Sequence, residues 1–183
     1  MVATEQLKGE HKGIKLMLNI LEEVCNRLES HRKVDSKHLQ QIIEFLTMFA
    51  DKCHHGKEED LLFPEMAKAG IPEDRGPIAV MLREHKQGRD YIRGMSEAIV
   101  KYRKGDKNLS SKIVKNARDY ISLLRQHIDK EDNVLYPMAD EQLSEDKQKE
   151  LFDGFEKIEM ERMGAGTHEK FHELLHKLRD VYL

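Results

Sequence analysis

The sequence predicts an all-α protein: an up-down-up-down four-helix bundle with a C-terminal helical extension of two shorter helices. The composition is 39% hydrophobic and 36% charged with only four prolines, which suits amphipathic helices better than strands. Apolar residues recur with helical spacing over long stretches of the chain. The breaks between the first four stretches are short, and short connections make consecutive helices antiparallel neighbours.

Six helices are expected, each bounded by recognisable start and stop signals. Asp35 or Ser36 can cap the second helix, and Pro77 suits the first turn of the third. Gly105 and Gly164 are expected just beyond helix ends. The expected helices cover approximately residues 4–29, 36–68, 77–104, 110–140, 145–163 and 167–183. At 183 residues the chain fits one domain, with the bundle in 1–140 and the C-terminal extension in 141–183.

A repeated pattern of histidines and glutamates runs through the predicted bundle. The repeated segments are His54-x-x-x-Glu58 with Leu62-Phe63-Pro64, which recur 73 residues later as His127-x-x-x-Glu131 with Leu135-Tyr136-Pro137. A second pair, Glu10-His11-Lys12 and Glu84-His85-Lys86, is offset by 74 residues. The bundle therefore reads as one helical hairpin used twice, and Pro64 and Pro137 are expected to kink their helices.

The repeated residues form a candidate metal site. Residues four apart lie on one face of a helix, with Cβ atoms about 5–6 Å apart, so each His-x-x-x-Glu pair can address one ion. A single histidine in an apolar stripe is usually a hydrogen-bonded core residue. Two buried carboxylates are harder to explain without a cation, because an isolated buried charge is very costly. The predicted ligands are His11, His54, Glu58, His85, His127 and Glu131.

Residues beside the predicted ligands are expected to have other roles. His55 is turned about 100° from His54 on an α-helix and is expected outside the metal ligands. Cys53 is expected to pack in the core and Glu59 to face solvent. In the last helix, His168 falls on the apolar stripe, whereas His172 and His176 drift away from it. His168 is thus either a further ligand or a histidine beside the helix cap.

Composition excludes several classes of protein. The 31 basic and 34 acidic residues are spread along the chain, so no basic block favours nucleic acid or a membrane surface. The apolar runs are far shorter than the roughly 20 residues of a membrane span. No secretory signal is visible at the N-terminus. Cys25 and Cys53 have no metal-type spacing, and reduced thiols in the cytoplasm are expected.

The set of six ligands resembles the hemerythrin-like family of HHE cation-binding domains. The resemblance covers about residues 5–140, and the repeated Leu-Phe/Tyr-Pro is similar to that family too. It implies an oxo- or hydroxo-bridged non-haem di-iron centre, with the four histidines as terminal ligands and Glu58 and Glu131 as bridges. A ferritin-type centre is disfavoured, because its Glu-x-x-His spacing occurs only on the last helix.

Two departures from the family's oxygen carriers affect the expected function. Arg89 stands where those carriers have a second histidine on the third helix, and Glu131 follows its histidine by four residues instead of five. The first departure leaves one nitrogen ligand missing, which His168, water, another carboxylate or a tyrosine could replace. These departures favour sensing or redox chemistry over simple oxygen carriage.

The leading expectation is a di-iron protein that binds or senses a small diatomic molecule or an oxidant, such as oxygen, nitric oxide or peroxide, or that senses iron or redox state. One alternative is a di-iron enzyme that reduces nitric oxide or peroxide, with metal-centred chemistry. Others are an iron storage or donation protein, and a structural bundle with zinc or no metal. The expected partner is the small ligand alone; the sequence leaves the oligomeric state open.

Overall fold

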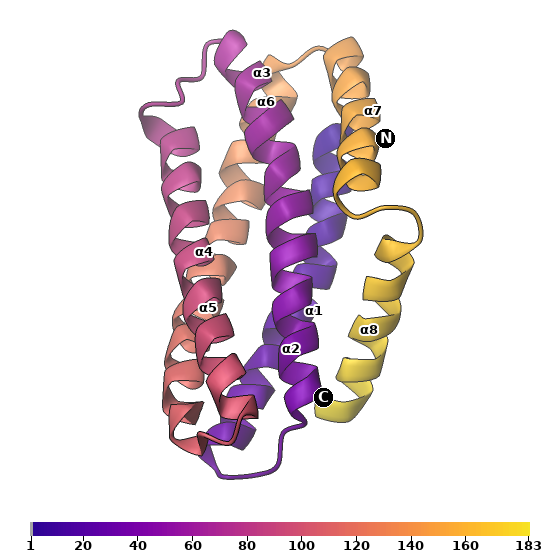
Figure 1. Ribbon diagram of the computed structural model, residues 1–183. Coiled ribbons are helices and arrows are strands. Elements are labelled where there is room, and N and C mark those ends of the chain that lie inside the picture. The colour runs from indigo at the N-terminus through magenta and orange to yellow at the C-terminus, as the bar shows by residue number, and fades with distance from the viewer. Residues whose placement is uncertain (1) are drawn as a thin grey trace.

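The computed structural model describes residues 2–183, and within this range the protein is all-α. The first two helical rods lie side by side in Figure 1. The first rod is α1 (Ala3–Glu29). The second consists of α2 (Ser36–Phe45), η1 (Leu46–His55), η2 (Glu58–Leu62) and α3 (Phe63–Lys68). The stretches η1 and η2 are π-helical.

The remaining rods complete the bundle and the C-terminal extension. The third is α4 (Gly76–Arg103), followed by a short 3-10 turn, η3 (Lys107–Leu109). The fourth consists of α5 (Ser110–Lys130), the π-helical η4 (Glu131–Leu135) and α6 (Tyr136–Gln142). The extension consists of α7 (Glu145–Arg162) and α8 (Thr167–Tyr182). The expected six-helix, all-α fold is therefore confirmed.

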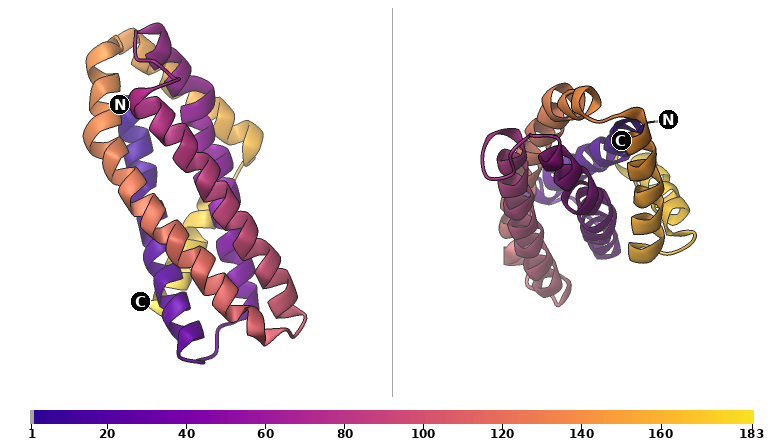
Figure 2. Two further views of the ribbon diagram at one scale, coloured as in Figure 1. Left: turned by 90° about the vertical axis from the view of Figure 1, so that its left-hand side faces the viewer. Right: turned by 90° about the horizontal axis from the view of Figure 1, so that it is seen from above.

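The two extension helices cover one side of the bundle. In Figures 1 and 2, α7 and α8 follow one another along the outside of the four long rods, and the two termini lie at opposite ends. Both helices contact α1; α7 also contacts η1 and η2, and α8 also contacts α2. None of the described helices is both long and apolar enough to cross a bilayer.

The helix ends follow the expected chemistry. The side chain of Asp35 accepts a hydrogen bond from the backbone N–H of Lys37 at 2.9 Å, which caps α2. Ser144 caps α7 by accepting from the N–H of Lys147 at 3.2 Å. Gly105 has a φ of 109°, a backbone conformation that favours glycine, at the turn that ends α4.

The apolar core is split into two clusters with a polar layer between them. The larger cluster fills one end of the bundle and includes Phe45, Met95 and Leu124. The smaller one fills the other end and includes Leu7, Phe63 and Phe155, the last from α7. The predicted metal ligands lie along the helices between these clusters, so water is excluded from both sides of that layer.

Each proline of the repeat follows a π-helical turn. Pro64 comes directly after η2 and Pro137 directly after η4, and these turns correspond at the 73-residue offset. Proline has no N–H and its ring crowds the carbonyl four residues earlier. The preceding turn is therefore wound more widely, with the i→i+5 pattern of a π-helix.

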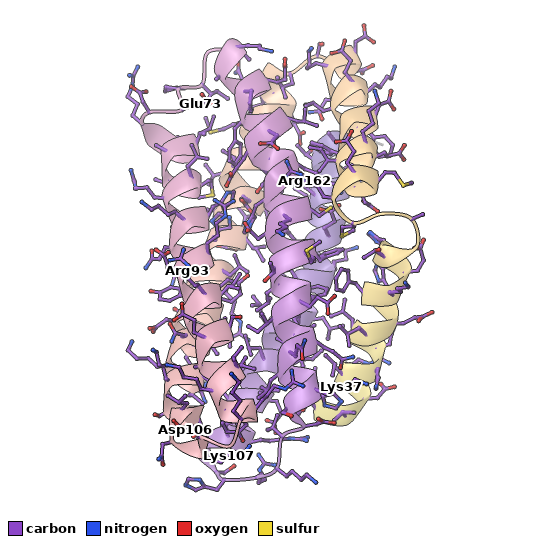
Figure 3. All side chains as sticks on the ribbon, in the orientation of Figure 1. Lys37, Glu73, Arg93, Asp106, Lys107 and Arg162 are labelled. Carbon is purple, nitrogen blue, oxygen red and sulfur yellow. The ribbon has the colours of Figure 1, made fainter. Side chains whose placement is uncertain are left out.

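Arg162, at the C-terminal end of α7, fastens the extension to the second rod (Figure 3). Its guanidinium donates to the carbonyl of Lys52 at 2.7 Å and pairs with Asp60. Gly56 is needed beneath it, because a Cβ at that position would collide with the guanidinium. The extension therefore packs onto the segment that carries the second rod's candidate ligands.

Candidate metal centre

All six ligands predicted within the bundle are brought together in its middle, in two adjacent groups. One group contains His55, Glu58, His85 and His127, and the other contains His11, His54 and Glu131; within each group the donor atoms lie within 4.8 Å of one another. All seven side chains are buried. We refer to these seven residues as the centre.

His55 belongs to the centre, so the expectation that it lies outside is wrong. Its ring stacks on His85 with centroids 3.8 Å apart, and the residue is only 5% exposed. The prediction assumed α-helical rotation between His54 and His55. In η1 each turn closes over five residues instead of four, so successive side chains rotate less around the axis and both histidines face inward.

Glu131 lies between the two groups. Its Oε2 is 3.1 Å from Nε2 of His11, whereas its Oε1 is 2.8 Å from Nε2 of His127 and 3.8 Å from Nε2 of His85. One carboxylate oxygen therefore faces each group, as a carboxylate that bridges two ions would.

Glu58 is placed in a similar way on the other side of the centre. Its Oε2 lies 3.3 Å from Nε2 of His85, and its Oε1 accepts a hydrogen bond from the Tyr136 hydroxyl at 2.7 Å. The Oε2 of Glu58 and both carboxylate oxygens of Glu131 are buried without a hydrogen-bond partner. Buried oxygens that face imidazole nitrogens in this way are the donors that a cation would satisfy.

An outer carboxylate orients each of the four repeated histidines. The Nδ1 atoms pair at 2.7–2.8 Å as His11–Asp132, His54–Glu10, His85–Glu59 and His127–Glu84. Because Nδ1 is engaged, Nε2 is the nitrogen that faces the centre. Outer carboxylates of this kind are typical of metal-binding histidines, whose tautomer and ring orientation they fix.

Each outer carboxylate is in turn held by a cation. The pairs are Asp132–Lys15, Glu10–Lys57, Glu59–Arg89 and Glu84–Lys130. Every member of these chains recurs at an offset of 73 or 74 residues: His11, Asp132 and Lys15 correspond to His85, Glu59 and Arg89, and His54, Glu10 and Lys57 correspond to His127, Glu84 and Lys130. The centre therefore has pseudo-two-fold symmetry.

Comparison with known families agrees with this geometry. The model of the hemerythrin HHE cation-binding domain matches residues 2–139. The chain belongs to this family. Uncharacterised proteins of Mycobacterium bovis and Mycobacterium tuberculosis are each 24% identical over 181 residues, which is 99% of this chain and 69% of each relative. No solved structure matches.

Arg89 of this HHE domain holds an outer carboxylate. It donates to Glu59 at 2.7 Å and to Asp51 at 2.8 Å, and it is the repeat partner of Lys15. Glu59 is accordingly half-buried and bonded to His85, so the expectation that it faces solvent is wrong. His55 supplies the fifth imidazole of the centre from the second rod, where the sequence had pointed to His168.

His168 lies outside both groups of the HHE centre, in contrast to its predicted place as a further ligand. Its Nδ1 is 2.9 Å from Oε1 of Glu159, its Nε2 is 2.8 Å from Nε2 of His172, and its ring packs edge-on against Phe49. The physical reason is that α8 docks on the outer side of α1 and α2. His168 therefore reaches the layer of outer carboxylates and not the centre.

The pseudo-symmetry of the HHE centre is broken at two positions. The repeat partner of His55 is Ile128, so only one group has a third imidazole. The repeat partner of Tyr136 is Phe63, so only one side has a hydroxyl. That hydroxyl lies 3.4 Å from Nε2 of His11, on the side with two imidazoles. The two groups therefore differ in both donor number and polarity.

Protonation of the centre follows from burial and mutual charge. Burial, together with the charges of His85 and His127, holds the pKa of His55 well below its usual range, so its imidazole is neutral. Burial would raise the pKa of Glu131, but its contacts with His127 and His11 hold it well below the usual value. A neutral imidazole beside an ionised carboxylate is the state in which both can bind a cation.

The outer carboxylates could have been found from the repeat. Glu10 and Glu84 precede corresponding histidines, and Glu59 and Asp132 each follow a predicted bridging glutamate. Acidic residues that recur at the same offset as the ligands were the signal. His55 carried no such signal, because its repeat partner is an isoleucine.

Proposed function

We propose that this HHE domain holds a bridged pair of non-haem irons and uses it to bind or sense a small diatomic molecule or oxidant. The donor set supports iron: five imidazoles, two carboxylates and no thiolate, all buried. Glu58 and Glu131 are placed to bridge the two ions. Cys25 and Cys53 are free, buried and outside both groups.

The unequal number of imidazoles carries the proposal. One ion would have His55, His85 and His127, while the other would have only His11 and His54. With the two bridging carboxylates common to both, the second ion has one protein donor fewer. A small ligand can bind at that position, and the bound iron pair supplies redox and Lewis-acid chemistry there.

The residues around the two-imidazole side control what can bind. Tyr136 is fully buried and burial raises the pKa of its phenol well above the usual value, so it keeps its proton and acts as a hydrogen-bond donor. The two apolar clusters on either side of the centre exclude bulk water. Together they favour a small, uncharged or weakly charged ligand that accepts one hydrogen bond.

The test is metal analysis of protein produced with iron, followed by titration with azide and nitric oxide. We expect about two irons per chain, near-ultraviolet absorption from a bridged ferric pair, and a spectral change on addition of either ligand. Glu131→Ala should lose most of the metal, because it removes a bridge. One metal per chain, zinc in place of iron, or a spectrum unaffected by both ligands would contradict the proposal.

An enzyme that reduces nitric oxide or peroxide is the second candidate, and the Tyr136 hydroxyl favours it because it is a proton donor beside the site. Turnover by the iron-loaded protein above that of free iron would support it. The depth of burial disfavours rapid iron release and hence a storage role. We propose a cytoplasmic location, with no nucleic acid or membrane partner.

A further inference from the structure

A second pair of histidines has the geometry of the pairs in the centre. Nε2 of His168 lies 2.8 Å from Nε2 of His172 on α8, with ring centroids 4.7 Å apart. The corresponding nitrogens are 3.0 Å apart between His11 and His54 and 3.1 Å apart between His85 and His127. In all three pairs the two Nε2 lone pairs can converge on one point.

His168 is also oriented as the ligands of the centre are. Its Nδ1 faces Oε1 of Glu159 at 2.9 Å, and Oε2 of Glu159 lies 3.0 Å from Nζ of Lys57. This is the same order of cation, carboxylate and imidazole that holds the four repeated histidines. A carboxylate on Nδ1 leaves Nε2 free to bind a metal and raises its basicity.

The segment from His168 to His172 reads His-Glu-x-x-His on a helix. Two histidines four residues apart lie on one helix face, and this spacing allows both to bind one zinc ion. His172 is exposed and His168 is half-buried, so an ion can reach the pair from solvent.

A cavity of about 330 Å³ opens beside the pair, between α8 and α1. It is lined by Glu5, Gln6, Gly9, Glu10, Gly13, Phe49, His168 and His172. The side-chain oxygen of Gln6 is buried without a hydrogen-bond partner, and Glu5 is a carboxylate without burial. The cavity therefore offers oxygen donors and negative charge next to the two nitrogens.

We propose that His168 and His172 form a second metal site, separate from the centre, which binds one divalent first-row transition ion of the zinc type. The two Nε2 atoms supply the nitrogens, and Gln6, Glu5 or water supply oxygens in the adjoining cavity. Two imidazoles with oxygen donors and no thiolate suit such an ion. Glu159 is a positioning residue that acts through His168. The site does not depend on iron in the centre.

Equilibrium dialysis of the parent and its variants against Zn²⁺ tests the site. His172→Ala should lose one zinc equivalent or bind it at least about tenfold more weakly, because a chelate becomes a single ligand. His176→Ala, an exposed histidine one turn further along α8, is the matched control and should bind as the parent does. Equal binding by His172→Ala and His176→Ala would overturn the proposal, because a direct hydrogen bond between the imidazoles then explains their contact.

Glu58→Ala separates this site from the centre. It should keep the zinc equivalent that His172→Ala loses, because Glu58 lies in the centre and not on α8. Loss of the same equivalent in both variants would assign it to the centre and overturn the second site. A centre without iron would leave the comparison of His172→Ala with His176→Ala unaffected, so the two proposals fail separately.

Discussion

At the residue scale, the two breaks in the repeat decide how the metals differ. His55 and Tyr136 have no chemical equivalent in the other half of the chain, where Ile128 and Phe63 stand. Both lie at the centre, yet one brings a nitrogen donor and the other a hydroxyl. Substitution at these positions therefore separates metal binding from tuning of the site.

His55→Ala should weaken metal binding on one side of the centre only. It removes one of three imidazoles, so iron content should fall from about two towards one per chain, with affinity for that ion at least about tenfold lower. Metal analysis after dialysis measures this. Ile128→Ala is the matched control: it should keep both irons while losing about 2–5 kcal/mol of stability through a core cavity. Unchanged iron in His55→Ala would contradict a ligand role.

Tyr136→Phe should keep both irons but alter ligand binding. The variant removes the hydrogen bond to Glu58 while leaving all seven residues of the centre in place. A hydrogen bond contributes about 1 kcal/mol, so azide affinity should change about fivefold. Tyr120→Phe is the control, because that buried hydroxyl has no hydrogen-bond partner. Loss of iron in Tyr136→Phe would show instead that the phenol is needed to assemble the site.

Six of the seven residues of the centre could be predicted because they recur at one offset on inward stripes. The remaining one, His55, depends on the winding of η1. A π-helical turn arises from backbone hydrogen bonding within a packed bundle, and the α-helical period used to interpret the sequence cannot represent it. The pairing of Nδ1 atoms with outer carboxylates could not be derived either, because each pair joins different helices.

At the element scale, α8 is coupled to the layer of outer carboxylates through His168 and Glu159. Contact with Glu159 raises the pKa of His168, while burial opposes this; Glu10 contributes in the same direction as Glu159, and Lys57 and burial oppose them. The same contact, supported by Lys57, lowers the pKa of Glu159 to about 2. In metal-free protein the ion pair therefore helps to hold α8 against the bundle.

This coupling predicts a pH dependence of stability in metal-free protein. A histidine whose pKa is raised on folding contributes stability below its unfolded pKa of about 6.5, and this contribution disappears as pH rises through the folded value. The thermal midpoint of the parent should therefore exceed that of His168→Gln near pH 6, and the difference should shrink towards pH 8.5. Thermal scans in the presence of a chelator measure it. A constant difference across this range would mean that His168 contributes by packing alone.

The six helices were predictable because each has its own apolar period and end signals. The place of α8 was not, because its stripe of Phe171, Leu175 and Leu178 indicates which face is buried but not which partner covers it. The structure packs that face on α1 and α2, which keeps His168 away from the centre.

At the scale of the whole molecule, metal binding should be a large part of stability. Buried carboxylates that face imidazoles disfavour the metal-free fold, and an ion bound only by the folded chain adds about 2.7 kcal/mol at 100 times its Kd. For a chain of this size that corresponds to roughly 5–10 °C in thermal midpoint. Calorimetry before and after chelation measures the shift. Equal midpoints would mean that the bundle is stable without an ion.

The pseudo-symmetry has a consequence for chains built from two identical halves. Two copies of the first hairpin would carry His55 and Phe63 twice, so both ions would have three imidazoles and neither would keep a vacancy. Two copies of the second hairpin would carry Ile128 and Tyr136 twice, so both ions would have two imidazoles and a neighbouring hydroxyl. The natural chain joins one half of each kind, and its divergence after duplication gives one ion for holding the pair together and one for meeting a ligand.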